Sequence, residues 1–244
     1  MALELGLEFP TDWGRREPAR SVRNVLLSGL LAPTMRYLST LEVRGLENLL
    51  SDTTMIFTAN HVSHLDTPLV LTALPGVVRH RLVVAGAMDT FFLRASKAIF
   101  TVLVFNVIPI ERHKVNRRSA ELAQRLLNEG WNLLIYPEGG RTTTGDLQEF
   151  KGGAAYLSEK TGARVVPTYI HGAGQLQGPK YAKADRFVNG PNNRRHHVVV
   201  AFGPALTQLE GENIRRFGVR IEAAVAELGR NVSDDDTYGR RVGV

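Results

Sequence analysis

The sequence predicts a single α/β domain in which helices cover a largely parallel or mixed sheet. Apolar runs of strand length alternate with segments of helical periodicity, and no repeat or low-complexity linker interrupts them. A length of 244 residues with 43% hydrophobic content is enough for one large domain with a substantial core. We therefore expect an α/β domain over residues 43–230, an N-terminal amphipathic helical segment over residues 1–42 and a flexible tail over residues 231–244.

The N-terminal segment contains a broken apolar stretch. Residues 1–13 lack the basic start and the apolar run of a secretory signal peptide, so we expect this end to stay uncleaved. Between residues 22 and 41, Asn24, Pro33 and Arg36 interrupt the leucines and valines, which argues against a span of about 20 apolar residues. With arginines preceding it, the stretch either lies flat on an anionic membrane surface or packs on the domain as an amphipathic helix.

Turn signals divide the first half of the domain into strands and helices. Pro75 and Gly76 end one helix, and Gly130 ends another, which begins at Asn116 and has alanines and leucines on one face. The expected strands cover residues 54–59, 82–86 and 107–110, and the expected helices cover residues 68–74, 90–104 and 116–130.

The second half continues the alternation and closes with an amphipathic helix. The expected strands cover residues 131–136, 164–170 and 197–202, and the expected helices cover residues 154–160 and 213–228. Strands joined by helical crossovers imply a largely parallel sheet that is covered on both faces. Ligand sites in such sheets gather beyond the carboxyl ends of the strands.

Composition limits the chemistry. The formal charge of +6 and the sequence pI near 9.8 favour anionic partners such as phosphate esters, lipid headgroups or nucleic acid. The absence of cysteine excludes disulfides, thiolate metal sites and a cysteine acyl-enzyme, and it permits a cytoplasmic setting.

His61 and Asp66 follow the expected strand over residues 54–59. Five residues advance roughly 500° around a helix, so the two side chains cannot share a helical face and His61 must precede the helix. From the helix start, Asp66 can fold back, fix the imidazole tautomer and stabilise the imidazolium formed on proton uptake. Capping is an alternative, since Ser63 and Asp66 fit a capping box, although capping does not explain His61.

A metal site is a second alternative for this segment. His61, His64 and Asp66 could contribute ligands, but the remaining histidines form no recognised zinc signature. We therefore expect no metal, and we expect His64 to be a solvated or packed neighbour.

Residues 137–141 form a glycine-rich turn after another expected strand. Backbone amides in such a turn, together with an arginine fork, can approach an oxyanion or a phosphate, although glycine pairs also occur in ordinary turns. Arg112 begins a basic cluster over residues 112–118, which would otherwise be a solvated helix entry. The residues that we expect to bind substrate are Arg112, Glu138, Gly139, Gly140 and Arg141.

Other motifs are weak or missing. Residues 171–174, with Gly178 beyond, imitate half of a dinucleotide fingerprint, but Pro179 stands where the binding helix should begin. The sequence contains neither a GK[ST] phosphate loop nor a GxSxG nucleophile elbow, which disfavours a serine hydrolase.

The motifs named above resemble those of the glycerophospholipid acyltransferase family, which includes the bacterial 1-acyl-glycerol-3-phosphate acyltransferases. The likeness covers about residues 43–206. It rests on four blocks in the family's order: NHxxxxD at residues 60–66, an apolar block ending in arginine at residues 106–112, a PEG[ST]R-like block at residues 137–141 and an apolar block with proline at residues 165–168. Asn106 stands where the family usually has glycine, and Gly140 stands where a hydroxyl residue is common.

The resemblance implies that His61 is a general base, that Asp66 orients it and that Arg112 contacts a glycerol phosphate. It implies transfer of an acyl group from acyl-CoA or acyl carrier protein to a (lyso)glycerophosphate, with lysophosphatidate as the expected acceptor and no cofactor. It also implies a peripheral position on the cytoplasmic, inner face of the membrane. We further expect Arg141 to share the phosphate and Glu138 to order the acceptor and the loop.

The competing class is a non-catalytic basic protein that binds nucleic acid or an anionic membrane through residues 112–118 and 194–197. The few aromatic residues are not interleaved with the charges, which argues against a single-strand stacking platform. We therefore expect no nucleic-acid partner.

Overall fold

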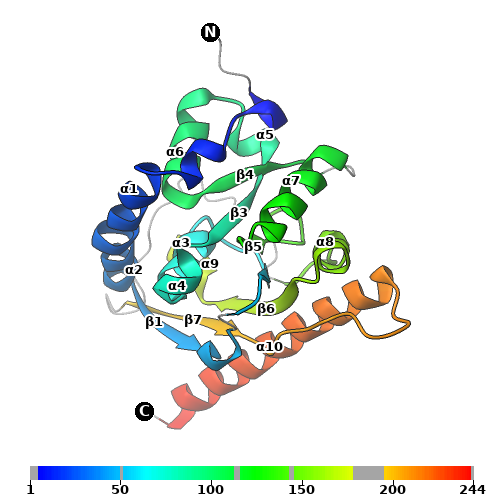
Figure 1. Ribbon diagram of the computed structural model, residues 1–244. Coiled ribbons are helices and arrows are strands. Elements are labelled where there is room, and N and C mark those ends of the chain that lie inside the picture. Colours follow the sequence, from blue (N-terminus) through cyan, green and yellow to red (C-terminus); the bar gives the residue numbers. More distant parts are fainter. Residues whose placement is uncertain (1–4, 50–51, 113–115, 143–145, 178–194, 243–244) are drawn as a thin grey trace.

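A seven-stranded mixed sheet runs through the centre of the protein (Figure 1). The computed structural model describes residues 5–49, 52–112, 116–142, 146–177 and 195–242. Its strands are β1 (Ser39–Arg44), β2 (Met55–Ala59), β3 (Leu82–Ala87), β4 (Val107–Ile110), β5 (Asn132–Ile135), β6 (Arg164–His171) and β7 (His196–Phe202). Their order is β1-β7-β6-β2-β5-β3-β4, and every neighbouring pair is parallel except β6 with β7. The prediction of a largely parallel or mixed sheet is confirmed.

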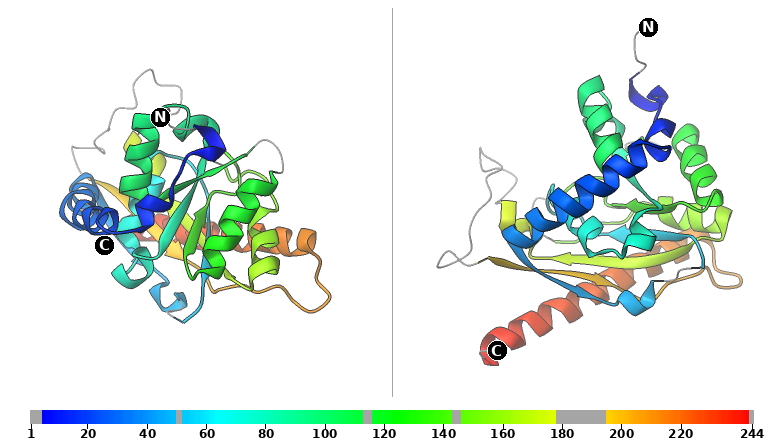
Figure 2. Two further views of the ribbon diagram at one scale, coloured as in Figure 1. Left: turned by 45° about the horizontal axis from the view of Figure 1, so that its top comes forward. Right: turned by 60° about the vertical axis from the view of Figure 1, so that its left-hand side comes forward.

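Helices cover both faces of this sheet. They are α1 (Ala19–Leu26), α2 (Ala32–Leu38), α3 (Asp66–Ala73), α4 (Gly76–Arg79), α5 (Met88–Phe91), α6 (Ala95–Phe105), α7 (Arg117–Asn128), α8 (Gly153–Thr161), α9 (Ala173–Gln177) and α10 (Ile214–Val242). Short 3-10 turns are η1 (Gly6–Glu8), η2 (Asp12–Arg15) and η4 (Leu46–Asn48), and a π-helical turn, η3 (Leu27–Leu31), joins α1 to α2. In Figure 2 the rod formed by α1, η3 and α2 lies on the opposite side of the sheet from α10.

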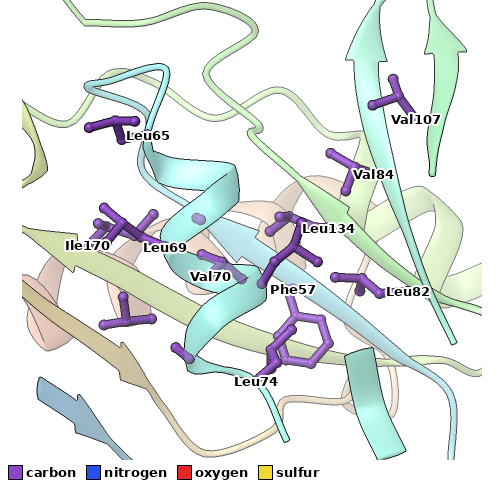
Figure 3. Close-up of a cluster of buried hydrophobic side chains, with 14 of the residues drawn as sticks. Phe57, Leu65, Leu69, Val70, Leu74, Leu82, Val84, Val107, Leu134 and Ile170 are labelled. Carbon is purple, nitrogen blue, oxygen red and sulfur yellow. The ribbon is translucent and has the colours of Figure 1, made fainter. Parts of the chain in front are cut away.

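The apolar run of β2 explains its central place. All five of its residues are buried, as expected for a strand covered on both faces. Ile56 and Phe57 point to opposite faces and join different core clusters. Figure 3 shows α3 over the sheet, with Leu69 and Val70 among the buried side chains between helix and strands. Burial of each such side chain contributes about 1.5–3 kcal/mol.

The expected strands are found within two residues of their predicted bounds, but the helix predicted over residues 90–104 is wrong. It is divided into α5 and α6, and Phe92 between them is fully buried. The Phe92 ring packs on Phe9, with 5.7 Å between ring centroids, and its carbonyl oxygen accepts a hydrogen bond from the amide of Gly6. Contacts with the N-terminal segment therefore break the helix that local periodicity predicted.

Two other expectations also need correction. Strand β1 pairs with β7 and crosses the expected domain boundary between residues 42 and 43. The closing helix does not end at residue 228 but continues through α10, so residues 231–242 of the expected flexible tail are helical. The reason is packing: a Cβ at Gly229 would lie 2.5 Å from the ring of Tyr169. Gly229 thus permits close contact with the sheet instead of ending the helix.

The N-terminal rod has one packed face and one exposed face. Leu27 and Met35 are buried against the core, as the packed-helix alternative predicted. Val25, Leu30 and Tyr37 remain largely exposed. No helix in the described part of the chain combines the length and the apolar character needed to cross a bilayer.

Candidate active site

The sequence-predicted site residues lie in loops at one edge of the sheet. His61 follows β2, the turn at residues 137–141 follows β5, and Arg112 follows β4. These strands are parallel members of the same sheet, so their carboxyl ends share an edge. The contacts described below bring these segments together.

Asn60 fixes the point at which the chain leaves the sheet. Its amide nitrogen donates to the carbonyl oxygen of Ile170 (3.1 Å), and its amide oxygen accepts from the backbone N–H of Ile170 (2.8 Å). The side chain, only 4% exposed, therefore replaces a peptide unit in pairing with β6. His61 is carried out of the sheet and into the turn.

His61 and Asp66 form a direct pair. The distance between His61 Nδ1 and Asp66 Oδ2 is 2.7 Å, and the Asp66 side chain is fully buried whereas that of His61 is 20% exposed. A carboxylate only accepts, so we assign the ring proton to Nδ1, which leaves the lone pair on Nε2. The pair has the geometry of a base with its orienting carboxylate.

Backbone amides hold Asp66 in this position. Its Oδ2 also accepts from the N–H groups of Val62 (2.8 Å) and Ser63 (2.9 Å). Asp66 is the first residue of α3, where a negative charge is favoured by the helix dipole. The expected capping box is only half formed, because the Ser63 hydroxyl accepts from the amide of Leu65 instead of that of Asp66. Capping and orientation of His61 thus use the same carboxylate.

Tyr136 covers one face of the imidazole. The two ring centroids are 4.1 Å apart and the planes differ by 21°. The phenol oxygen lies 2.9 Å from Thr67 Oγ1. Burial, and secondly the charge of Asp66, raise the pKa of Tyr136 well above its usual value, so its hydroxyl stays protonated at neutral pH. Sequence reasoning gave this residue no role, although an aromatic residue before the Pro137 turn was a usable signal.

Glu138 ties the glycine turn to His61. One carboxylate oxygen accepts from the backbone N–H of His61 (2.7 Å), and the other accepts from the N–H of Gln148 (3.1 Å). On the other side, the N–H of Thr142 donates to the carbonyl oxygen of His61 (2.8 Å). Burial raises the pKa of Glu138. The side chain holds the loop in place, with both of its oxygens engaged by backbone amides.

Arg112 reaches the same turn from β4. Its Nε and Nη2 donate to Asp89 Oδ2 (3.1 and 2.8 Å), and its Nη1 donates to the carbonyl oxygen of Gly139 (3.3 Å). An arginine side chain has five N–H donors, so among the described residues two remain for a ligand. Asp89 was missed by sequence reasoning, although it follows β3 at the same edge of the sheet.

Gly140, the next member of the turn, lies beside Arg112. A Cβ at Gly140 would be 3.8 Å from Arg112 Nη1, and Arg141 follows, partly buried. The basic cluster does not act as one unit, because Arg117 pairs with Glu121 (2.7 Å) and Arg118 pairs with Glu8. His113 and Lys114, like Gly178 and Pro179 of the half fingerprint, lie outside the described residues.

Asn106, the unusual residue of the second block, has a backbone explanation. It ends α6 with φ of 54°, in the left-handed region that glycine and asparagine tolerate best. It is 1% exposed, and its side-chain amide donates to the carbonyl oxygen of Leu82 (2.8 Å). The position therefore needs a residue that can adopt positive φ.

Further observations concern the histidine neighbour and possible metal ligands. His64 is exposed, as one of its two expected states requires. Within the described ranges, no group of three His, Cys, Asp or Glu side chains is placed to hold a metal ion.

A cavity of about 260 Å³ lies apart from these residues, between the N-terminal segment and α7. Its charged side chains are largely paired with one another: Asp12 with Arg125 (3.5 Å), and Arg118 with neighbouring Glu8. The paired charges make it a poorer anion site than the turn beside Arg112.

The known proteins that this chain resembles are acyltransferases. A family model described as Acyltransferase matches residues 40–171. A chloroplastic 1-acyl-sn-glycerol-3-phosphate acyltransferase from Arabidopsis thaliana is 29% identical over 145 residues, covering 56% of this chain and 37% of that protein. The human beta form is 30% identical over 157 residues (62% of this chain, 54% of that protein), and the alpha form from Ovis aries is 26% identical over 225 residues (90% and 74%). The chain thus spans less than two thirds of the plant and human beta proteins.

A solved structure shares the fold. The crystal structure of the 1-acyl-sn-glycerophosphate acyltransferase PlsC from Thermotoga maritima aligns with a TM-score of 0.61 and 22% sequence identity. The alignment covers 90% of this chain and 83% of that one.

Proposed function

Since this chain belongs to the acyltransferase family, we propose that it moves a fatty acyl group from an acyl thioester to the hydroxyl of a phosphorylated glycerol, converting lysophosphatidate to phosphatidate. The similarity to 1-acyl-sn-glycerol-3-phosphate acyltransferases supports this acceptor. The observation that carries the proposal is the buried Asp66 carboxylate, 2.7 Å from His61 Nδ1, next to a turn that also contacts Arg112. One edge of the sheet then supplies both a base and an anion site.

His61 acts as the general base. A thioester is already activated, so the demanding step is removal of the acceptor's hydroxyl proton as the oxygen attacks the carbonyl carbon. Nε2 takes that proton, and the Asp66 carboxylate stabilises the resulting imidazolium. The C–S bond of the tetrahedral intermediate then breaks, and the imidazolium gives its proton to the leaving thiolate. General-base catalysis of this kind contributes roughly 10²–10⁴-fold in rate, and it needs no covalent enzyme intermediate.

Arg112 and Arg141 bind the acceptor's phosphate. Asp89 and the carbonyl oxygen of Gly139 take three of the five N–H donors of Arg112 and leave two for phosphate oxygens. Gly139 and Gly140 let the backbone of the turn approach the ligand closely. Glu138 orders the loop through its bonds to the backbone amides of His61 and Gln148, and the acceptor sites that these two bonds leave on its oxygens orient the substrate.

The donor and the cellular setting complete the proposal. Acyl-CoA or acyl carrier protein supplies the acyl group, and no cofactor is required. The protein binds peripherally to the inner face of the membrane through apolar side chains flanked by arginines and lysines. Support comes from the exposed Val25 and Leu30 on the rod and from Leu93 and Phe100 near Lys97 of α6.

Thiol release from acyl-CoA with lysophosphatidate as acceptor tests the reaction class. We expect His61→Ala to lower kcat by about 10²–10⁴-fold, whereas His64→Ala, a matched change at an exposed histidine three residues away, leaves it unchanged. Normal release by His61→Ala would reject the base assignment. Acceptor-independent release by the wild type would reject transfer.

A further inference from the structure

Lys151 lies against the glycine turn, although it belongs to none of the four sequence blocks. Its Nζ donates to the carbonyl oxygen of Arg112 (2.5 Å), and its backbone N–H donates to the carbonyl oxygen of Pro137 (3.0 Å). One residue thus contacts both the end of the Arg112 segment and the start of the turn.

The conformation of Gly139 is matched to this lysine. Gly139 has φ of 74°, and a Cβ there would lie 2.5 Å from Lys151 Nζ and 3.0 Å from its Cε. The lysine stem therefore passes over the face of Gly139 that any other residue would fill. The packing places an ammonium group directly beside the backbone that is proposed to approach phosphate.

The charges around the turn leave Lys151 without an acidic counterpart. Asp89 balances Arg112, with 2.8 Å between Asp89 Oδ2 and Arg112 Nη2. No carboxylate of the described residues forms an ion pair with Lys151. An ammonium group has three donors, and a single carbonyl oxygen uses one of them. Lys151 is exposed, so a doubly charged phosphate can reach it, and that phosphate would supply negative charge and acceptors for the two donors that the carbonyl oxygen does not use.

We propose that Lys151 is a further ligand of the acceptor's phosphate and that it makes the site selective for a phosphomonoester. The inference rests on the proposed function, because it assigns the anion at this turn to the acceptor. Arg112 presents a planar fork, whereas Lys151 adds a compact point charge beside Gly139. Acceptors with a free hydroxyl but no phosphate gain nothing from this charge.

Steady-state kinetics with Lys151→Met test the proposal. A charge-assisted hydrogen bond corresponds to about a 10- to 100-fold change in affinity, so the KM for lysophosphatidate should rise by that factor while kcat changes little. The KM for acyl-CoA and the rate with monoacylglycerol should match the wild type, and Lys151→Arg should recover part of the loss. Lys160→Met is the matched control, since Lys160 lies at the far end of α8 and pairs with Glu159.

Two kinetic outcomes would overturn the assignment. One is an unchanged KM for lysophosphatidate in a Lys151→Met variant that melts like the wild type. The other is a rise in the KM for acyl-CoA alone, which would assign Lys151 to the phosphates of the donor.

Equilibrium binding separates this inference from the reaction itself. Calorimetric titration with glycerol 3-phosphate should give at least tenfold weaker binding to Lys151→Met than to the wild type. Equal affinities would reject the role of Lys151 even if the wild type transfers acyl groups. A wild type that transfers none, yet binds glycerol 3-phosphate through Lys151, would reject the proposed function alone.

Discussion

The proposed base and the proposed anion-binding turn are held by different physical means. Asp66 is fully buried, and its Oδ2 accepts from two backbone amides besides His61. Arg112 and Asp89 are instead 31% and 34% exposed, so water screens their ion pair. The His61–Asp66 pair is thus fixed in one arrangement. The exposed ion pair between Arg112 and Asp89 can instead be loosened when a ligand binds to Arg112. Catalysis requires the first property and reversible binding requires the second.

The largest effect should come from neutralising the buried carboxylate. Asp66→Asn keeps the shape of the side chain but removes the charge that stabilises the His61 imidazolium. We expect kcat to fall by about 10²–10⁴-fold, with the KM for lysophosphatidate within about threefold of the wild type. Steady-state assays, with thermal melting to verify folding, would measure this. A kcat within threefold of the wild type in a folded variant would contradict the claim that the charge of Asp66 assists His61.

A substitution in the proposed anion site should change mainly the KM for lysophosphatidate. Arg112→Met removes the two donors left for phosphate and the bond to Gly139, so the KM for lysophosphatidate should rise about 10- to 100-fold with a smaller change in kcat. Arg117→Met is the control, because that exposed arginine pairs with Glu121 on the surface of α7. If kcat fell strongly while KM stayed constant, Arg112 would contribute to the chemical step and not to binding of the phosphate.

The smallest of these effects concerns Tyr136. Its ring limits rotation of the imidazole, so Tyr136→Leu should lower kcat about three- to tenfold, in line with roughly 0.5–1.5 kcal/mol for an aromatic pair. Tyr136→Phe keeps the stacking and should stay close to the wild type. Because the pKa of the phenol is raised, the pH–rate profile of Tyr136→Phe should overlay that of the wild type up to about pH 10. A divergence below that pH would mean that the hydroxyl titrates in the working range.

Much of the fold follows from local pattern. The apolar run of β2 predicts a buried strand, and Asn116 predicts the start of α7, where its side chain accepts from the amide of Ser119. The predicted secondary structure is wrong where contacts between residues far apart in the sequence determine it. Phe92 breaks a helix because the N-terminal segment covers it, and β1 forms only because β7, more than 150 residues away, pairs with it.

The site also contains some residues that the sequence predicts and others that it does not. The positions of His61 and Arg112 follow from the rule that the carboxyl ends of parallel strands share an edge. The roles of Asp89, Tyr136 and Lys151 depend on which way their side chains point across that edge. No spacing in the sequence encodes those directions, so only the folded chain reveals these three partners.

The most direct test of the account is the protonation pattern of the His61 ring, measured by 15N NMR on protein labelled at histidine. We predict that, when the ring is neutral, Nδ1 carries the proton and Nε2 the lone pair, and that Asp66→Asn weakens this preference. A ring protonated on Nε2, or the same tautomer populations in the wild type and in Asp66→Asn, would contradict the claim that Asp66 prepares His61 to accept a proton.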